Sequence, residues 1–173
     1  MEQHLNSHTT MSDDRLYVTN SMVTKKVRLS DYIDKVRILS KLFCKEVSSY
    51  SNTYKESDSN NINWEYLLML EDCGDLVFII VTDLSEVYGF SSWIKTSDIN
   101  DSTISTLRMI NLFIHPDKQK KYGGLLLIKH AEQIAKELEI TGISITVHVD
   151  SKIDVLAERL GFHERCIEYY KSI

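Results

Sequence analysis

Residues 114–125 read IHPDKQKKYGGL and join the two elements that decide the fold class. Before this stretch, residues 106–115 are strand-like, and Pro116 ends the strand because proline withdraws a donor from the ladder. After it, residues 122–139 are predicted to be an amphipathic helix, with one apolar stripe. The stripe consists of Leu127, Ala131, Ile134 and Leu138. A strand at 143–149 follows, and strand, helix and strand in this order predict a right-handed unit with parallel strands.

The elements on either side of this unit predict the rest of the sheet. We expect a first strand at 22–29, and then a helix with Ser30 as its N-cap. A short helix is predicted at 64–70, with strands at 76–81 and 87–94. A second short helix, capped by Asp150 or Ser151 and closed by Gly161, is followed by an extended segment at 162–170. The strands at 76–81 and 87–94 read as a hairpin. The predicted class is therefore α+β, a mixed and mostly antiparallel sheet with one parallel βαβ unit and flanking helices.

Length and composition indicate one ordinary globular domain. The chain has 173 residues, of which 43% are hydrophobic and 26% charged. Residues 1–20 are polar and without periodicity, so we expect a flexible N-terminal arm there, with a single domain over 21–173. The longest apolar runs, 76–81 and 125–128, are too short to cross a bilayer, which speaks against a membrane protein.

Charge and cysteine content narrow the class further. Twenty basic and 25 acidic residues leave a net charge of −5, which disfavours direct DNA binding. The three cysteines form no CxxC pair, and the first 20 residues contain no apolar signal segment. We therefore expect reduced thiols, a cytoplasmic location and no zinc ribbon. His4 and His8 lie four residues apart but have no third ligand nearby, and His115, His130 and His163 have no partners at metal-ligand spacing, so no metal site is predicted.

The start of the predicted helix has the properties of an anion site. Its first N–H groups are unpaired, and Gly123 and Gly124 leave room for a ligand to approach the main chain. Three nearby cations add to this site: Lys118, Lys120 and Lys121. A pyrophosphate cradle and a plain solvated turn fit these residues equally well. The stretch contains neither GxxxxGK[ST] nor GxGxxG.

Two motifs resemble the GNAT family of acyl-CoA N-acyltransferases. Residues 114–116 are similar to the family's V-x-P strand end, and Gln119 and Gly124 match two positions of its Q/R-x-x-G-x-G/A loop. Residues 150–162 resemble the family pattern N-x-x-A-x-x-L-Y-x-x-x-G-F. Three positions depart from these patterns, namely Tyr122 for a glycine, Asp150 for the asparagine and Ala157 for the tyrosine.

The resemblance implies an N-acetyltransferase that moves an acetyl group from acetyl-CoA, a co-substrate, to a primary amine by direct attack. Pantetheine would lie along the open edge of the 106–115 strand, and the pyrophosphate would bind the loop and the helix start. The implied cofactor-binding residues are Leu112, Phe113, Ile114, Gln119, Lys120, Lys121, Tyr122, Gly123, Gly124, Leu125 and Asp150. The acceptor is a small molecule or a protein. The family often dimerises, so a homodimer is also among the expectations.

The sequence contains no obvious catalytic acid or base. Ala157 stands where the family has its proton-donating tyrosine, and Arg108 and Met109 occupy strand positions where relatives often have glutamate. Our candidates are His148 at a strand end, as a relay, and Tyr169 or Tyr170 as a substitute acid. Purely structural roles for them stay open. Two alternatives also stay open: a catalytically weak or inactive CoA-binding GNAT-like regulatory module, and a plain interaction domain.

Overall fold

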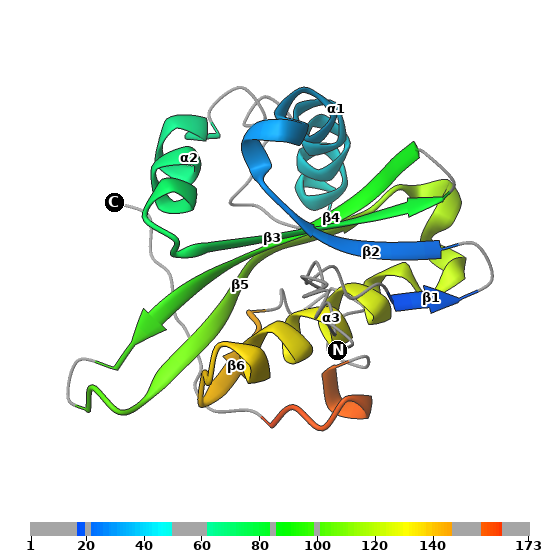
Figure 1. Cartoon of the computed structure of the whole chain (residues 1–173). Coiled ribbons are helices and arrows are strands. Elements are labelled where there is room, and N and C mark those ends of the chain that lie inside the picture. Colours follow the sequence, from blue (N-terminus) through cyan, green and yellow to red (C-terminus); the bar gives the residue numbers. More distant parts are fainter. Residues whose placement is uncertain are drawn as a thin grey trace, which may run out of the picture.

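The computed structural model describes residues 17–19, 22–49, 62–83, 86–98, 101–146 and 157–163. They form a six-stranded sheet whose strands follow one another in chain order (Figure 1). The strands are β1 (Tyr17–Thr19), β2 (Met22–Val27), β3 (Leu76–Asp83), β4 (Glu86–Ser97), β5 (Ser105–Ile114) and β6 (Gly142–Ser144). The first five pair antiparallel, and β6 pairs parallel with β5.

Helices cover both faces of this sheet. Helices α1 (Leu29–Ser48) and α2 (Trp64–Asp72) lie on one face, and α3 (Gly123–Glu137) lies on the other (Figure 1). The short 3-10 helix η2 (Pro116–Lys121) joins β5 to α3. The α+β class and the parallel β5–α3–β6 unit predicted from the sequence are thereby confirmed.

Strand β3 separates two apolar cores. Its residues Leu76 to Thr82 are all buried, with Val77, Ile79 and Val81 in the α3 core. Phe78 and Ile80 belong to the core under α1 and α2. A strand buried on both faces has a continuous apolar sequence, which explains why 76–81 was recognisable without alternation.

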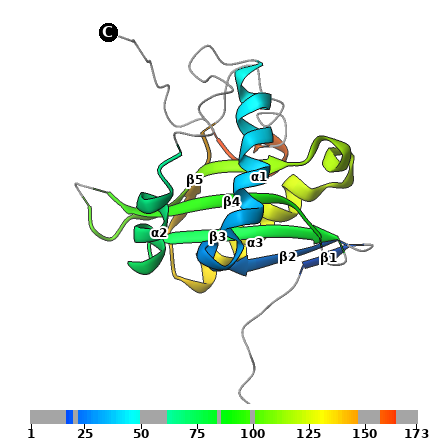
Figure 2. The ribbon, with the colours of Figure 1, turned by 90° about the horizontal axis from the view of Figure 1, so that it is seen from above.

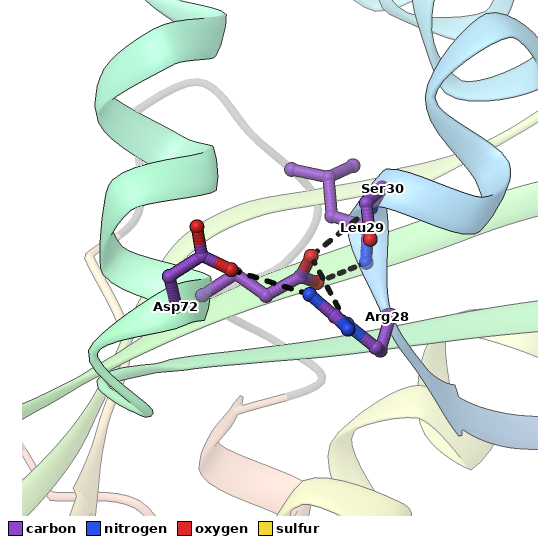
Figure 3. A network of polar contacts seen from close by, with 5 residues as sticks. Arg28, Leu29, Ser30 and Asp72 are labelled. Carbon is purple, nitrogen blue, oxygen red and sulfur yellow. Dashed lines mark hydrogen bonds and ion pairs between the residues drawn. The ribbon is translucent and has the colours of Figure 1, made fainter.

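The start of α1 differs from the prediction, because Ser30 is not its N-cap. The cap position is Arg28, which makes no side-chain cap bond, and Leu29 is the first helical residue. The Glu71 carboxylate of α2 accepts hydrogen bonds from the main-chain N–H groups of Leu29 and Ser30 (Figure 3). Arg28 in turn lies 3.7 Å from Glu71 and 3.2 Å from Asp72. A carboxylate at a helix N-terminus stabilises the helix, and here it also links α1 to α2.

Several predicted boundaries shift. Tyr17–Thr19 fall within the predicted arm 1–20 but pair with β2. The strand predicted at 22–29 ends at Val27 because Leu29 already belongs to α1. Leu138, the last residue of the predicted stripe, follows the end of α3 and is 39% exposed. In the C-terminal part, Gly161 closes the helical turn at 157–159 with φ 82°, as predicted. Phe162 N–H donates to Ala157 O at 3.1 Å.

Some predictions fall outside the described residues. These are residues 147–149 of the predicted 143–149 strand and the 162–170 segment beyond His163. Residues 145–146, also predicted as strand, follow the end of β6. Within the described ranges, no helix has the length and apolarity that crossing a bilayer requires.

Candidate active site

The gap between β5 and β6 defines the candidate site. The two strands pair only where Thr106, Leu107 and Arg108 face residues 142–144, and β5 continues to Ile114 without a further partner on that edge among the described residues. Opposite β4, a bulge leaves Ile110 without a paired residue. A bulge bends its strand. Among the described residues, the second half of β5 has no partner on the side of β6, and we call this side the open edge.

Two residues of β5 present their main-chain groups to this open edge. His115 N–H donates to Tyr88 O of β4 at 2.8 Å, and the carbonyl of Phe113 lies against Gly89 of β4. Within a trans peptide the C=O and the following N–H point in opposite directions. Ile114 therefore directs both its N–H and its C=O away from β4, and by strand alternation Leu112 does the same.

Phe113 differs from its neighbours, although the resemblance places it with them. Its main-chain carbonyl faces β4, and its side chain is 2% exposed in the core under α1. The ring lies edge-on to Phe43 of α1, with 6.0 Å between centroids, and 6.1 Å from Phe90. Its contribution is therefore to hold β5 under α1, beside the open edge.

The N-terminus of α3 lies next to the open edge. Gly123 is buried, and a Cβ there would lie 2.9 Å from Ile114 Cδ1. A Cβ at Gly124 would meet only Leu112 Cδ2, at 3.6 Å. The N–H groups of Gly123, Gly124 and Leu125 come before the first bond of the helix, in which Leu126 N–H donates to Tyr122 O at 3.0 Å. The first turn contains no acidic residue, so this helix end is suited to an anion.

Tyr122 adopts the conformation for which a glycine is usually needed. It has φ 63° and ψ 11°, in the left-handed region, and its side chain is 74% exposed. For an L-residue with a side chain this backbone costs about 1–2 kcal/mol. The departure from the family's glycine therefore places backbone strain at Tyr122 itself.

Gln119 connects the loop to α1. Its Nε2 donates to Ile114 O at 3.3 Å, on the open edge, and to Glu46 Oε1 at 3.0 Å. Sequence reasoning missed Glu46, which lies 73 residues away on the last turn of α1. No local pattern marks it, since its position depends on how α1 crosses the sheet.

Of the three lysines predicted for the anion site, Lys118 has a described side chain. Lys118 lies 3.8 Å from Asp83 and 5.9 Å from the centre of the Tyr88 ring, so its side chain is directed to the β3–β4 end. Tyr88 is 4% exposed, and burial, with the Asp83 charge as a second cause, raises its pKa to about 12. The side chains of Lys120 and Lys121 lie outside the described part.

The predicted catalytic residues are not described. His148, Tyr169 and Tyr170 lie outside the described ranges, as does Asp150. Ala157 is 8% exposed, Arg108 is exposed and Met109 is 5% exposed. The described residues contain no group of histidine, cysteine and carboxylate side chains that could hold a metal ion.

No protein-family model matches the chain, and no curated protein does. Solved structures do. An aminoglycoside acetyltransferase from an uncultured soil metagenomic sample, in complex with trehalose, matches with TM-score 0.67 and 13% identity, over 89% of this chain and 97% of the other. A GNAT family acetyltransferase from Staphylococcus aureus has TM-score 0.61 and 17% identity, over 88% and 99%.

A third match is glucosamine-6-phosphate N-acetyltransferase from Arabidopsis thaliana, with TM-score 0.63 and 12% identity, over 88% of this chain and 99% of that one. At such identities the similarity establishes the fold and leaves the acceptor open. The chain has the GNAT-like acetyltransferase fold, as the two motifs indicated.

Proposed function

We propose that the protein is an acetyl-CoA-dependent N-acetyltransferase that acts on a primary amine. The observation that carries this proposal is the open edge of β5 directly beside the N-terminus of α3. An open strand edge provides main-chain partners for the amides of pantetheine, and a helix N-terminus provides N–H groups for a diphosphate. The GNAT-like fold supports the same assignment.

Different residues would bind different parts of acetyl-CoA. Leu112 and Ile114 would bind pantetheine through their main-chain groups, and the N–H groups of Gly123, Gly124 and Leu125 would bind the diphosphate. Lys120, Lys121 and Asp150 are further proposed contacts from the sequence. Gln119 would first have to release Ile114 O, the carbonyl that its side chain contacts.

The main-chain N–H of Leu112 would supply the electrostatic help in the reaction. It would donate to the thioester carbonyl oxygen, where negative charge develops when the amine attacks. The amine nitrogen forms a bond to the acetyl carbon, the carbon–sulfur bond breaks, and the proton lost by nitrogen ends on the departing sulfur. A thiol has a pKa near 8.5, so its thiolate leaves with little help from an acid.

The reaction also requires a proton to move from the attacking amine to the departing sulfur. The attacking amine has to be neutral, although a free alkyl amine has a pKa near 10.4. We propose that His148 relays the proton. Because Ala157 stands where the family has its acid tyrosine, we propose Tyr169 or Tyr170 as the acid. Such groups contribute about 10²–10⁴-fold, so their loss predicts slow turnover with intact cofactor binding.

A CoA-binding module of weak or no activity is the second candidate, and Ala157 at the tyrosine position favours it. One experiment separates the two. The protein is melted with and without CoA and acetyl-CoA, and transfer from labelled acetyl-CoA is then measured across a panel of amines and peptides. Stabilisation with transfer supports the enzyme, and stabilisation without transfer supports the module. No stabilisation at millimolar concentrations refutes both.

A further inference from the structure

Glu46 belongs to the last turn of α1 (Leu29–Ser48). Figure 2 shows α1 crossing β3, β4 and β5, with its last turn beyond β5. Phe43, one turn earlier, contacts Phe113 of β5. The Glu46 carboxylate then reaches the Gln119 amide at 3.0 Å, and that same nitrogen lies 3.3 Å from Ile114 O on the open edge. The carboxylate is therefore two hydrogen bonds away from the edge that would bind pantetheine.

Among the described side chains, this carboxylate has a neutral partner and no positive one. Glu46 is half-buried, and within the described ranges no Lys, Arg or His nitrogen lies within 4 Å of it. Arg28 and Arg37 pair with other carboxylates, and Lys118 pairs with Asp83. A half-buried negative charge beside a neutral amide gains free energy when a cation reaches it, and gains more than at a fully exposed site.

The separation of Ile114 from Leu112 along β5 indicates which part of the bound acceptor would carry that cation. Leu112, the proposed donor to the thioester oxygen, precedes Ile114 by two residues, which is about 7 Å of strand. At that distance the carboxylate is out of hydrogen-bond reach of the reacting nitrogen. The position beside Ile114 instead suits a second charge on the acceptor, several atoms from the nitrogen that reacts.

We propose that Glu46 binds a second ammonium group of the acceptor, which makes the acceptor a di- or polyamine. The inference rests on the proposed function and adds the class of acceptor to it. Gln119 holds one carboxylate oxygen in place, and the other oxygen receives the ammonium. The net charge of −5 favours the approach of a polycation.

The test compares amines that differ only in the second charge. Acetyl transfer to 1,4-diaminobutane and spermidine is measured against butylamine, for the wild type, Glu46→Gln, Glu46→Asp and Asp34→Asn. Asp34 is the control, because it is an exposed acid on the same helix that pairs with Arg37. We expect the wild type and Asp34→Asn to prefer the diamine at least ~10-fold in kcat/KM, mainly through KM. Glu46→Gln should bring this ratio towards one, and Glu46→Asp should give an intermediate ratio.

The ratio separates recognition from folding, because a structural defect slows both amines alike. Raising the salt concentration should also shrink the wild-type preference, since screening weakens a charge contact. An equal rate for both amines in the wild type overturns the inference, and so does a preference that survives in Glu46→Gln. Protein that binds acetyl-CoA but neither binds nor acetylates the diamine overturns it as well, while the proposed function stands. Absence of acetyl-CoA binding overturns both.

Discussion

The substitution Gly124→Glu should stabilise the free protein and abolish CoA binding. Gly124 is the second residue of α3, and a Cβ there has its nearest neighbour, Leu112 Cδ2, at 3.6 Å, so the side chain fits. Replacing glycine in a helix gains up to about 1 kcal/mol, and a carboxylate in the first turn adds about 0.3–1 kcal/mol. For a chain of this length a gain of about 1 kcal/mol raises the melting temperature by roughly 2–4 °C.

The same carboxylate would occupy the place proposed for the diphosphate. At a CoA concentration of 100 times Kd, the wild type should gain about 2.7 kcal/mol. That gain corresponds to a rise of roughly 5–11 °C in melting temperature at this chain length. Gly124→Glu should show no rise, although it melts higher than the wild type without ligand.

Two variants separate charge from bulk at this position. Gly124→Gln has the size of glutamate without its charge and should lose part of the CoA stabilisation. Gly124→Ala should keep most of it. The measurement is melting with and without CoA, followed by calorimetric titration. If CoA stabilised Gly124→Glu as much as the wild type, the cradle at α3 would be refuted. A lower melting temperature in the absence of ligand would refute the description of the helix start.

Three further predictions concern stability. A methyl group at Gly89 would lie 2.7 Å from a main-chain oxygen of β5, so Gly89→Ala should cost about 1–3 kcal/mol in chemical denaturation and also weaken CoA binding. Gly142→Ala, whose Cβ would have 4.0 Å to its nearest neighbour, should cost far less, and equal losses would contradict the reasoning. Glu71→Ala leaves two N–H groups of α1 without their acceptor and should cost about 1–3 kcal/mol, whereas Asp72→Ala, at a 73% exposed carboxylate, should cost under about 1 kcal/mol. Burial lowers the pKa of His130, with Lys26 acting in the same direction and Glu137 against it. Below about pH 6.5 the unfolded chain therefore binds a proton that the folded chain does not, and stability should fall as the pH drops. Melting temperatures between pH 7.5 and 5.5 should fall more for the wild type than for His130→Gln, and parallel curves would show that His130 is not responsible.

The sheet and its helices could be predicted where each element has a local signature. Strand β3 is apolar from Leu76 to Val81, α3 has an apolar stripe, and Pro116 marks the end of β5. Each of these signals lies within one element, so it does not depend on contacts with the rest of the chain. The cap of α1 is different, because Ser30 is a good capping residue by type. Glu71, 42 residues from Leu29, takes that role because α2 packs beside the start of α1.

Tyr122 and Glu46 show why the site itself was only partly predictable. The loop pattern places a glycine at 122, where this chain has Tyr122 in a left-handed conformation. Both ends of the loop are fixed by contacts that the pattern does not contain. His115 bonds to Tyr88, and the Gln119 side chain bonds to Ile114 and Glu46. Contacts that fix both ends of a short connection can impose a strained conformation between them, at a cost of about 1–2 kcal/mol. Strain at Tyr122 and the position of Glu46 are thus two consequences of the same tertiary contacts, and the local sequence specifies neither.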